Sequence, residues 1–336
     1  MPADPRDMDH SPASSAAPNV LVTAIGSLSA EPVIASLRRF GVGRIVGCDI
    51  HPQAWLASAA GVDAFLQVPL AASEPDLYLQ VLGDLCSRHA ISHLIPLTDV
   101  EVDLFARRAA ALPRGVTICA PLDRAALLRD KYAWQQVLRQ SFPDHVIPTA
   151  TFSEAIAGAL AFPLIGKPRN GRSMQGFVKV PALADLSAIG STIDRDSYIF
   201  QPLLTSAVFV VDVLRDRHIS KTVTVGRREL TRTANGAGLA VQLEPSAELG
   251  RIATELADAL DIHGCINFEF MRADDRYLLM DINPRFSAGV GVSAEAGYDM
   301  VQNCLKLHMG LPTGEQISYA ETIFSRRIGT FERIGE

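Results

Sequence analysis

The sequence has no uninterrupted apolar run of the roughly 18 residues that a membrane-spanning helix needs. Its amino-terminal segment has no apolar centre either, so a secretory signal peptide is not expected there. Residues 1–18 are polar and rich in Pro, Ser, Ala and Asp, which predicts a disordered leader. We therefore expect a cytoplasmic protein with no membrane partner.

Cysteine and lysine are both scarce. The five cysteines are odd in number, far apart and mostly inside apolar runs, with no C-x-x-C pair or Cys/His cluster. This pattern excludes a disulfide scaffold, makes a structural zinc site improbable, and indicates core residues in a reducing compartment. Only five of the 31 basic residues are lysine. A lysine in a distinctive setting therefore carries weight, because its compact charge suits phosphate.

Length and charge narrow the class of protein further. A chain of 336 residues is long enough for two or three domains. Hydrophobic residues make up 48% and charged residues 20%, which is typical of a globular protein. The net charge of -6 argues against nucleic acid as the main partner, because phosphate backbones attract positive surfaces.

Strand-like and helix-like segments alternate through residues 19–120, which predicts a parallel sheet covered by helices. The G-x-G-x-x-G fingerprint is absent after the first strand, so a dinucleotide site is not expected there. Thr98, Asp99 and Glu101 begin a helix after a strand end. They are predicted to be a helix cap with dipole-compensating acids, and a substrate cleft at this point is the alternative.

Beyond residue 121 the pattern changes. A helical stretch over 121–141 precedes strands at 162–168, 177–180 and 197–201, and further strands at 208–214 and 218–225 precede a helix near 246–260. Residues 264–271 and 276–281 are predicted to form a hairpin. We therefore expect a largely antiparallel sheet with helices on one side, divided into lobes at 121–202 and 203–336.

A glycine-bearing polar loop follows Lys167. It contains Gly171, Ser173 and Gly176 and lies between two predicted strands, so its backbone N–H groups can fold over phosphate oxygens. It is not a Walker A loop, because Lys167 is followed by Pro168. A plain hairpin connection with solvated arginines is the alternative interpretation.

The predicted hairpin brings oxygen ligands together. Asp281 and Asn283 share a strand face, and Glu269 on the partner strand can lie opposite them. Two carboxylates and an amide oxygen are hard ligands of the kind that Mg²⁺ prefers, and Arg285 would lie beside the phosphates. An edge hairpin with solvated acids is the alternative. The apolar flanks favour the metal site, because buried acids need compensation.

Residues 280–287, with the sequence Met-Asp-Ile-Asn-Pro-Arg-Phe-Ser, resemble the E-I-N-P-R-F-S signature of the ATP-grasp superfamily, in its carbamoyl-phosphate-synthase-like branch of carboxylate-amine ligases. Residues 162–168 are similar to the F-P-x-x-x-K-P strand of that branch, and Asp130-Lys131 to its opening D-K. The resemblance spans nearly the whole chain. It implies an N-terminal parallel-sheet preATP-grasp, Rossmann-like domain at 19–120, followed by a two-lobed α+β ATP-grasp domain.

The resemblance also implies roles for individual residues. Arg285, and less directly Arg232, would stabilise the transferring phosphoryl group, while the nearby Arg227 and Arg228 are alternatives that would bind a substrate carboxylate. ATP is the implied nucleotide, with Mg²⁺, or alternatively Mn²⁺, as the metal. The implied ATP-binding residues are Lys131, Lys167, Gly171, Ser173, Gly176 and the main chain of Gln201 and Leu203, and the implied metal ligands are Glu269, Asp281 and Asn283.

Three positions depart from the family pattern. Asp281 stands where the family has glutamate, Val208 where it has a ribose-binding glutamate, and Gln201-Pro202 where it has a hinge acid. Pro202 has no N–H to donate. These departures affect nucleotide contacts and turnover more than the fold.

The implied function is ATP-dependent ligation of a carboxylate to an amine through an acyl phosphate, with ADP and phosphate as products. The substrates would be small acids and amines, amino acids among them. Phosphoryl transfer of the carbamoyl-phosphate-synthase type and a non-catalytic nucleotide-binding protein are the alternatives. The sequence does not specify the acid, the amine or the oligomeric state, and a homodimer is the commonest state for enzymes of this size.

Overall fold

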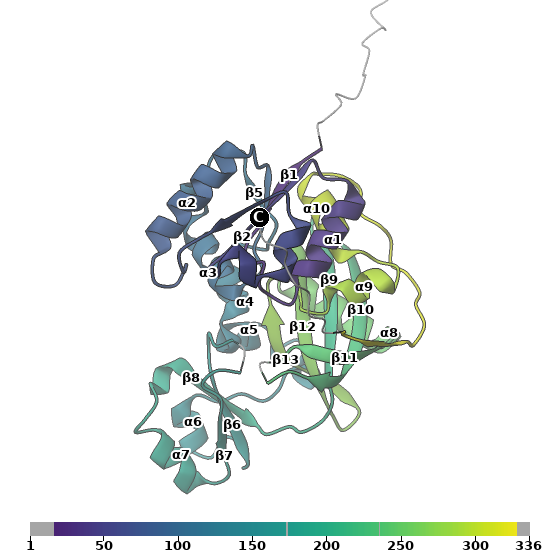
Figure 1. Ribbon diagram of the computed structural model, residues 1–336. Helices are drawn as coiled ribbons and strands as arrows, with labels where there is room; N and C mark the ends of the chain where they lie inside the picture. The colour runs from purple at the N-terminus through teal and green to yellow at the C-terminus, as the bar shows by residue number, and fades with distance from the viewer. Residues whose placement is uncertain (1–16, 173, 235, 328–336) are drawn as a thin grey trace, which may run out of the picture.

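The chain folds around three sheets (Figure 1). A computed structural model describes residues 17–172, 174–234 and 236–327, so most of the predicted leader, residues 1–16, lies outside the described residues. The sheets have five, three and six strands, in the orders β3-β2-β1-β4-β5, β7-β6-β8 and β13-β12-β9-β10-β11-β14. The α/β class and the order of a parallel sheet followed by antiparallel ones are as predicted.

The N-terminal sheet is wholly parallel, and helices cover both of its faces. Parallel strands direct their carboxyl ends to one edge, so the loops after β1, β2 and β4 meet there. Its strands are β1 (Asn19–Val22), β2 (Arg44–Asp49), β3 (Ala64–Gln67), β4 (His93–Ile95) and β5 (Thr117–Ile118), and its helices are α1 (Ala30–Phe40), α2 (Pro75–Arg88) and α3 (Asp99–Arg108).

A smaller lobe, built on the three-stranded antiparallel sheet, has its own apolar core of residues such as Leu164, Leu186 and Phe200. Helices α4 and α5, which the sequence analysis grouped with this lobe, pack elsewhere, since Trp134 and Leu138 of α5 lie in the core of the larger sheet. The elements are α4 (Ala125–Arg129), α5 (Lys131–Leu138), α6 (Phe152–Ile156), β6 (Leu164–Pro168), β7 (Val178–Val180), α7 (Leu183–Ile189) and β8 (Tyr198–Pro202).

The six-stranded sheet is antiparallel and contains the predicted hairpin of β12 and β13. Asp274 and Asp275 form its turn with φ of 47° and 64°, the left-handed conformation that two-residue hairpin turns require. Strand β14 and helix α9 were not predicted, because elements this short show no periodicity; helix α10 was also missed. The elements are β9 (Val208–Asp216), β10 (Lys221–Arg232), β11 (Gly238–Leu243), α8 (Ala247–Ala259), β12 (Gly264–Ala273), β13 (Arg276–Asn283), α9 (Val290–Glu295), α10 (Met300–His308) and β14 (Ile323–Ser325).

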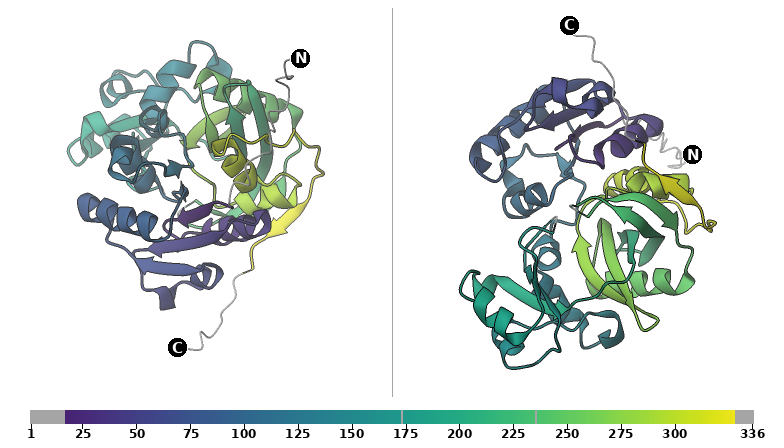
Figure 2. Two further views of the ribbon diagram at one scale, coloured as in Figure 1. Left: turned by 90° about the horizontal axis from the view of Figure 1, so that it is seen from above. Right: turned by 60° about the horizontal axis from the view of Figure 1, so that its bottom comes forward.

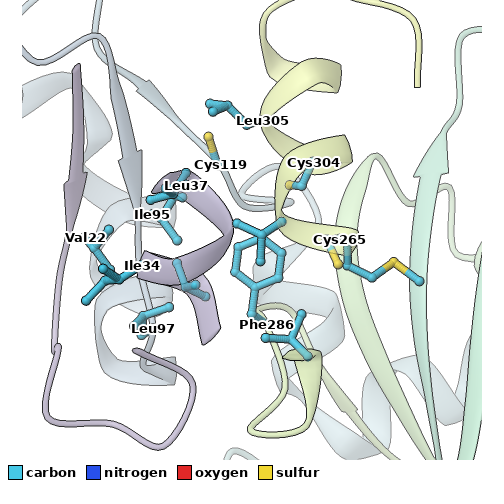
Figure 3. Close-up of a cluster of buried hydrophobic side chains, with 14 of the residues drawn as sticks. Val22, Ile34, Leu37, Ile95, Leu97, Cys119, Cys265, Phe286, Cys304 and Leu305 are labelled. Carbon is cyan, nitrogen blue, oxygen red and sulfur yellow. The ribbon is translucent and has the colours of Figure 1, made fainter. Parts of the chain in front are cut away.

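One continuous apolar core joins the N-terminal domain to the larger lobe. Figure 3 shows Ile34 and Leu37 of α1 on one side of this core and Cys304 of α10 on the other, with Phe286 between them. Phe286 is 3% exposed. This shared core holds the N-terminal sheet at a fixed place relative to the strands that carry the candidate site. Within the described residues, no helix is both long and apolar enough to cross a membrane.

Candidate active site

A cavity of about 340 Å³ lies between the smaller lobe and the larger sheet. In the right-hand view of Figure 2 these two parts lie side by side, with the N-terminal domain across one end of both. Apolar side chains line part of it, among them Ile147, Ile165, Leu204, Val208, Val210 and Met271. The charged side chains of the lining, here called the charged end, include Lys167, Arg232, Glu269, Asp281 and Arg285.

Asp130 precedes helix α5 and Lys131 is its first residue; neither lines the cavity, but Lys131 contacts Asp281 of the charged end. The Asp130 carboxylate caps the helix by accepting hydrogen bonds from the N–H groups of Tyr132 and Ala133. This cap positions Lys131, which is buried and lies 3.0 Å from Asp281 Oδ1. Lys131 also donates to the Gly171 carbonyl at 3.0 Å. The predicted phosphate lysine is therefore held between the glycine loop and the acidic strand β13.

Lys167, on β6, is only 4% exposed and lines the cavity. It forms no ion pair with any residue that the structure describes, and its Nζ lies 5.4 Å from the centre of the Phe177 ring. Burial lowers the pKa of Lys167 to about 8, although the nearby Asp281 opposes this effect. A desolvated ammonium group without a counter-ion is a favourable site for a phosphate oxygen.

The predicted metal ligands do come together. The register of β12 and β13 places Glu269 opposite Asp281 and Asn267 opposite Asn283. Asn283 Nδ2 donates to Glu269 Oε1 at 3.2 Å. Within the described residues no three His, Cys, Asp or Glu side chains cluster as a metal site, so two carboxylates and one amide form the candidate set. Paired acids on one face of a sheet fit a hard cation bound jointly with phosphate oxygens.

In this structure, cationic side chains neutralise those acids. Arg232 donates to Glu269 Oε2 at 2.8 Å and lies 2.5 Å from Glu229. Lys131 occupies the same relation to Asp281. Each of the two acids therefore already has a cationic neighbour. A phosphate group and a metal ion bound at this end would replace these two ion pairs with new ones.

Arg285 connects the site to the N-terminal domain. Its guanidinium donates two hydrogen bonds to Asp99, at 2.9 Å and 3.2 Å. Burial alone would raise the pKa of Asp99, but Arg285 and Arg129 outweigh it and hold the pKa at about 2. Thr98 and Glu101 form the predicted cap of α3, with both reciprocal hydrogen bonds present. Asp99 therefore projects from a capped helix end and orients Arg285.

Glu229 and Arg172 are charged residues of the cavity lining that had not been predicted as site residues. Glu229 is buried in the cavity wall, where burial raises its pKa, and Arg172 lies in the glycine loop. Alternation along β10 was the signal for Glu229, because Arg227 and Glu229 share a face while Arg228 points away and donates to Gln242. Arg227 lines the cavity, but its guanidinium is buried against Asp212 at 2.7 Å.

Only some of the residues predicted to bind the nucleotide line the cavity. Gln201 and Leu203 line the cavity, and the buried Gln201 Oε1 accepts no hydrogen bond from the described residues. The Leu203 N–H, however, donates to the Pro163 carbonyl at 2.9 Å, so it is not free for an adenine ring in this structure. Gly171 lines the cavity, whereas Gly176 is held outside it by the Tyr198 hydroxyl at 2.9 Å. Ser173 lies outside the described residues.

The chain is similar in sequence or fold to several known proteins. Residues 194–330 match a family model described as ATP-grasp in the biosynthetic pathway with Ter operon. Over 206 residues the chain is 23% identical to acetyl-CoA carboxylase of Dictyostelium discoideum. That match covers 58% of this chain and only 9% of the length of the larger protein.

Solved structures share the fold along most of the chain. The β,γ-ATP complex of biotin carboxylase from Campylobacter jejuni has a TM-score of 0.74 and 16% identity, over 90% of this chain and 74% of that one. L-amino acid ligase from Bacillus licheniformis has a TM-score of 0.67 and 15% identity, over 89% and 75% of the two chains. The family match over residues 194–330 and the fold shared along most of the chain both agree with the predicted resemblance to the ATP-grasp superfamily.

Proposed function

We propose that the protein is an ATP-dependent carboxylate-amine ligase that acts through an acyl phosphate. The carrying observation is the cavity, which combines apolar lining residues, the buried Lys167, which has no ion pair within the described residues, and two acids on adjacent strands. This arrangement matches the two halves of a nucleotide, a flat apolar base and a string of phosphates. The similarity in fold to an amino acid ligase and to a nucleotide-bound carboxylase supports the proposal.

The reaction would proceed in two displacements. A carboxylate oxygen of the acid attacks the γ-phosphorus, the bond from that phosphorus to the bridging oxygen breaks, and ADP leaves. The amine then attacks the acyl carbon, phosphate leaves with the electron pair of the C–O bond, and the amine proton passes to phosphate or water. Phosphate is a far better leaving group than the oxygen of a free carboxylate, so the protein has mainly to position the reactants and neutralise charge.

The charged residues divide this work. Lys131 and Lys167 would hold phosphate oxygens, and Arg285 would face the oxyanion that develops in each displacement. Glu269, Asp281 and Asn283 would hold Mg²⁺, which neutralises charge on the phosphates when it is bound. Glu229 would keep Arg232 oriented as Glu269 turns to the metal. Five free cysteines, all buried, are consistent with the proposed cytoplasmic location.

The test is hydroxamate formation from pooled organic and amino acids with MgATP, because hydroxylamine replaces the unknown amine and traps an acyl phosphate. We expect hydroxamate and ADP in equal amounts from the wild type, and neither from Lys167→Ala or Arg285→Ala. Lys306→Ala, on α10, and Arg251→Ala, on the exposed face of α8, are matched controls that should keep full activity.

ATP binding without either product from any acid would contradict the ligase proposal. The protein would then be better described as a non-catalytic nucleotide-binding protein. This alternative is compatible with Val208 in place of the family's glutamate and with the hydrogen bond of the Leu203 N–H to Pro163. ADP formation with no hydroxamate would instead indicate transfer to another acceptor.

A further inference from the structure

A second cavity, of about 520 Å³, lies beside the nucleotide cavity, and we propose that it binds the carboxylic acid substrate and selects acids with an apolar body. This inference rests on the proposed function, because it assigns the acid of that reaction to a place and a chemical class. The cavity opens at the carboxyl ends of β1, β2 and β4 in the N-terminal domain.

The two cavities meet at one junction. Arg172, Ala237, Arg285 and Ala288 line both of them. A molecule in the second cavity can therefore present one end to the charged end of the first without leaving its own site. That end of the first cavity holds Lys167 and the two paired acids, where the γ-phosphoryl group of ATP would lie.

Several apolar side chains are part of the lining of the second cavity. Leu28, Ile50 and Leu70 line it and are 47%, 42% and 46% exposed. Trp55, the most exposed large apolar residue at 74%, stacks on His51 of the same lining. Exposed apolar side chains that cluster at one opening indicate a binding surface, whereas single ones scattered over a protein do not. Burying them against an apolar ligand would recover the free energy that their exposure costs.

The acids of the second cavity are already committed to the protein. Asp49 accepts hydrogen bonds from the N–H groups of Gly26 and His51, at 2.7 Å and 2.9 Å. Glu101 accepts from Tyr78 and from both the N–H and the hydroxyl of Thr98. These carboxylates shape the strand ends and leave apolar contact as the main attraction for the body of a ligand.

The arginines at the junction supply the complementary charge. Arg172 forms no ion pair with the rest of the described chain, and it is exposed where the cavities join. Arg285 is fixed beside it by Asp99. A carboxylate is the group that two guanidinium groups would hold at this point. The geometry thus orients an acid with its apolar body in the N-terminal domain and its carboxylate toward the nucleotide.

The experiment compares acids of rising apolar size in the hydroxamate assay with MgATP: acetate, succinate, hexanoate and 4-phenylbutyrate. We expect kcat/KM to rise from acetate to 4-phenylbutyrate and to be low for succinate. Ile50→Asp and Leu70→Asp should raise KM for the apolar acids by about tenfold or more, with KM for MgATP unchanged. Ile219→Asp is the matched control, because Ile219 is 67% exposed and lies outside both cavities.

Two results would overturn the inference while the ligase proposal stands. One is a preference for acetate or succinate. The other is turnover of the apolar acids by Ile50→Asp and Leu70→Asp at the wild-type rate. If no acid yields hydroxamate, the ligase proposal fails, and direct binding decides the inference. Trp55 stacks on His51 of the cavity lining and the other tryptophan, Trp134, is fully buried, so a change in fluorescence on binding reports on Trp55. Saturable quenching by 4-phenylbutyrate that Ile50→Asp abolishes supports the apolar site, and its absence in the wild type refutes it.

Discussion

Replacing Asp99 by asparagine should lower the free energy of unfolding by about 2.5 kcal/mol at pH 7. Asp99 is 3% exposed and binds Arg285 through two hydrogen bonds, with Arg129 Nη1 3.7 Å away. Its pKa of about 2, against an ordinary 3.8, corresponds to that free energy, because each pKa unit is about 1.4 kcal/mol. The substitution removes the negative charge and leaves the Arg285 guanidinium without its counter-ion, while Arg129 keeps Asp103 at 3.2 Å.

The pH dependence of this stability difference is a second, independent test of the prediction. A carboxyl whose pKa is depressed by folding stabilises the native state above its ordinary pKa, and this contribution is lost as pH falls toward 2. Near pH 3 about half of the difference between wild type and Asp99→Asn should remain. Urea unfolding followed by circular dichroism at pH 7 and pH 3 measures both values.

Asp76→Asn is the matched control for this prediction. Asp76 also pairs with an arginine, Arg108, at 2.6 Å, but it is 83% exposed on the neighbouring helix α2. A solvated pair contributes little, so this substitution should cost less than about 0.5 kcal/mol. The reasoning would be refuted if both substitutions lowered the free energy of unfolding equally at pH 7. It would also be refuted if the difference between wild type and Asp99→Asn were the same at pH 3 as at pH 7. Asp99→Asn should also reduce hydroxamate formation about tenfold or more, because Arg285 loses the group that orients it.

Three further outcomes are expected. The Kd of MgATP, measured with a fluorescent analogue, should rise as pH passes about 8, because Lys167 then loses its proton; Lys167→Arg should remove this dependence, and a flat wild-type profile up to pH 9.5 would contradict it. Glu269→Gln and Asp281→Asn should each raise the Mg²⁺ concentration for half-maximal ADP formation about tenfold or more, and unchanged Mg²⁺ titrations would count against the metal assignment. Phe286→Ala should lower the free energy of unfolding by about 3–5 kcal/mol in urea titrations, since its ring fills the core between the N-terminal domain and the larger lobe; a loss below about 1 kcal/mol would mean that the core closes around the gap.

Local pattern was enough for most of the elements and for part of the candidate site. Alternating strands and helices predicted the N-terminal parallel sheet, and the two runs around Asp274 and Asp275 predicted the hairpin. A hairpin pairs residues that are close in sequence, so the period of two along each strand placed Glu269 opposite Asp281 before any tertiary contact was known. The family signature beginning at Met280 then supplied the chemistry that such a pair suggests.

Local sequence pattern could not predict contacts between distant segments. The partnership of Asp99 with Arg285 spans 186 residues, and no periodicity connects a helix cap in one domain to a strand end in another. Glu229 entered the cavity wall because β10 continues to Arg232, past the predicted end of that strand. The commitment of the Leu203 N–H to Pro163 likewise depends on how the smaller lobe closes on itself.

The sequence by itself determined which residues could do the chemistry, since charge, hydrogen-bonding capacity and strand period are local properties. Only the tertiary structure decided what those residues face. Packing around Phe286 brings the carboxyl ends of the N-terminal strands against the cavity of the candidate site, and this contact creates the junction at Arg172 and Arg285. The physical reason is that burial of apolar surface is non-directional, so the sequence specifies that these faces must be covered while the complete fold selects which faces cover each other.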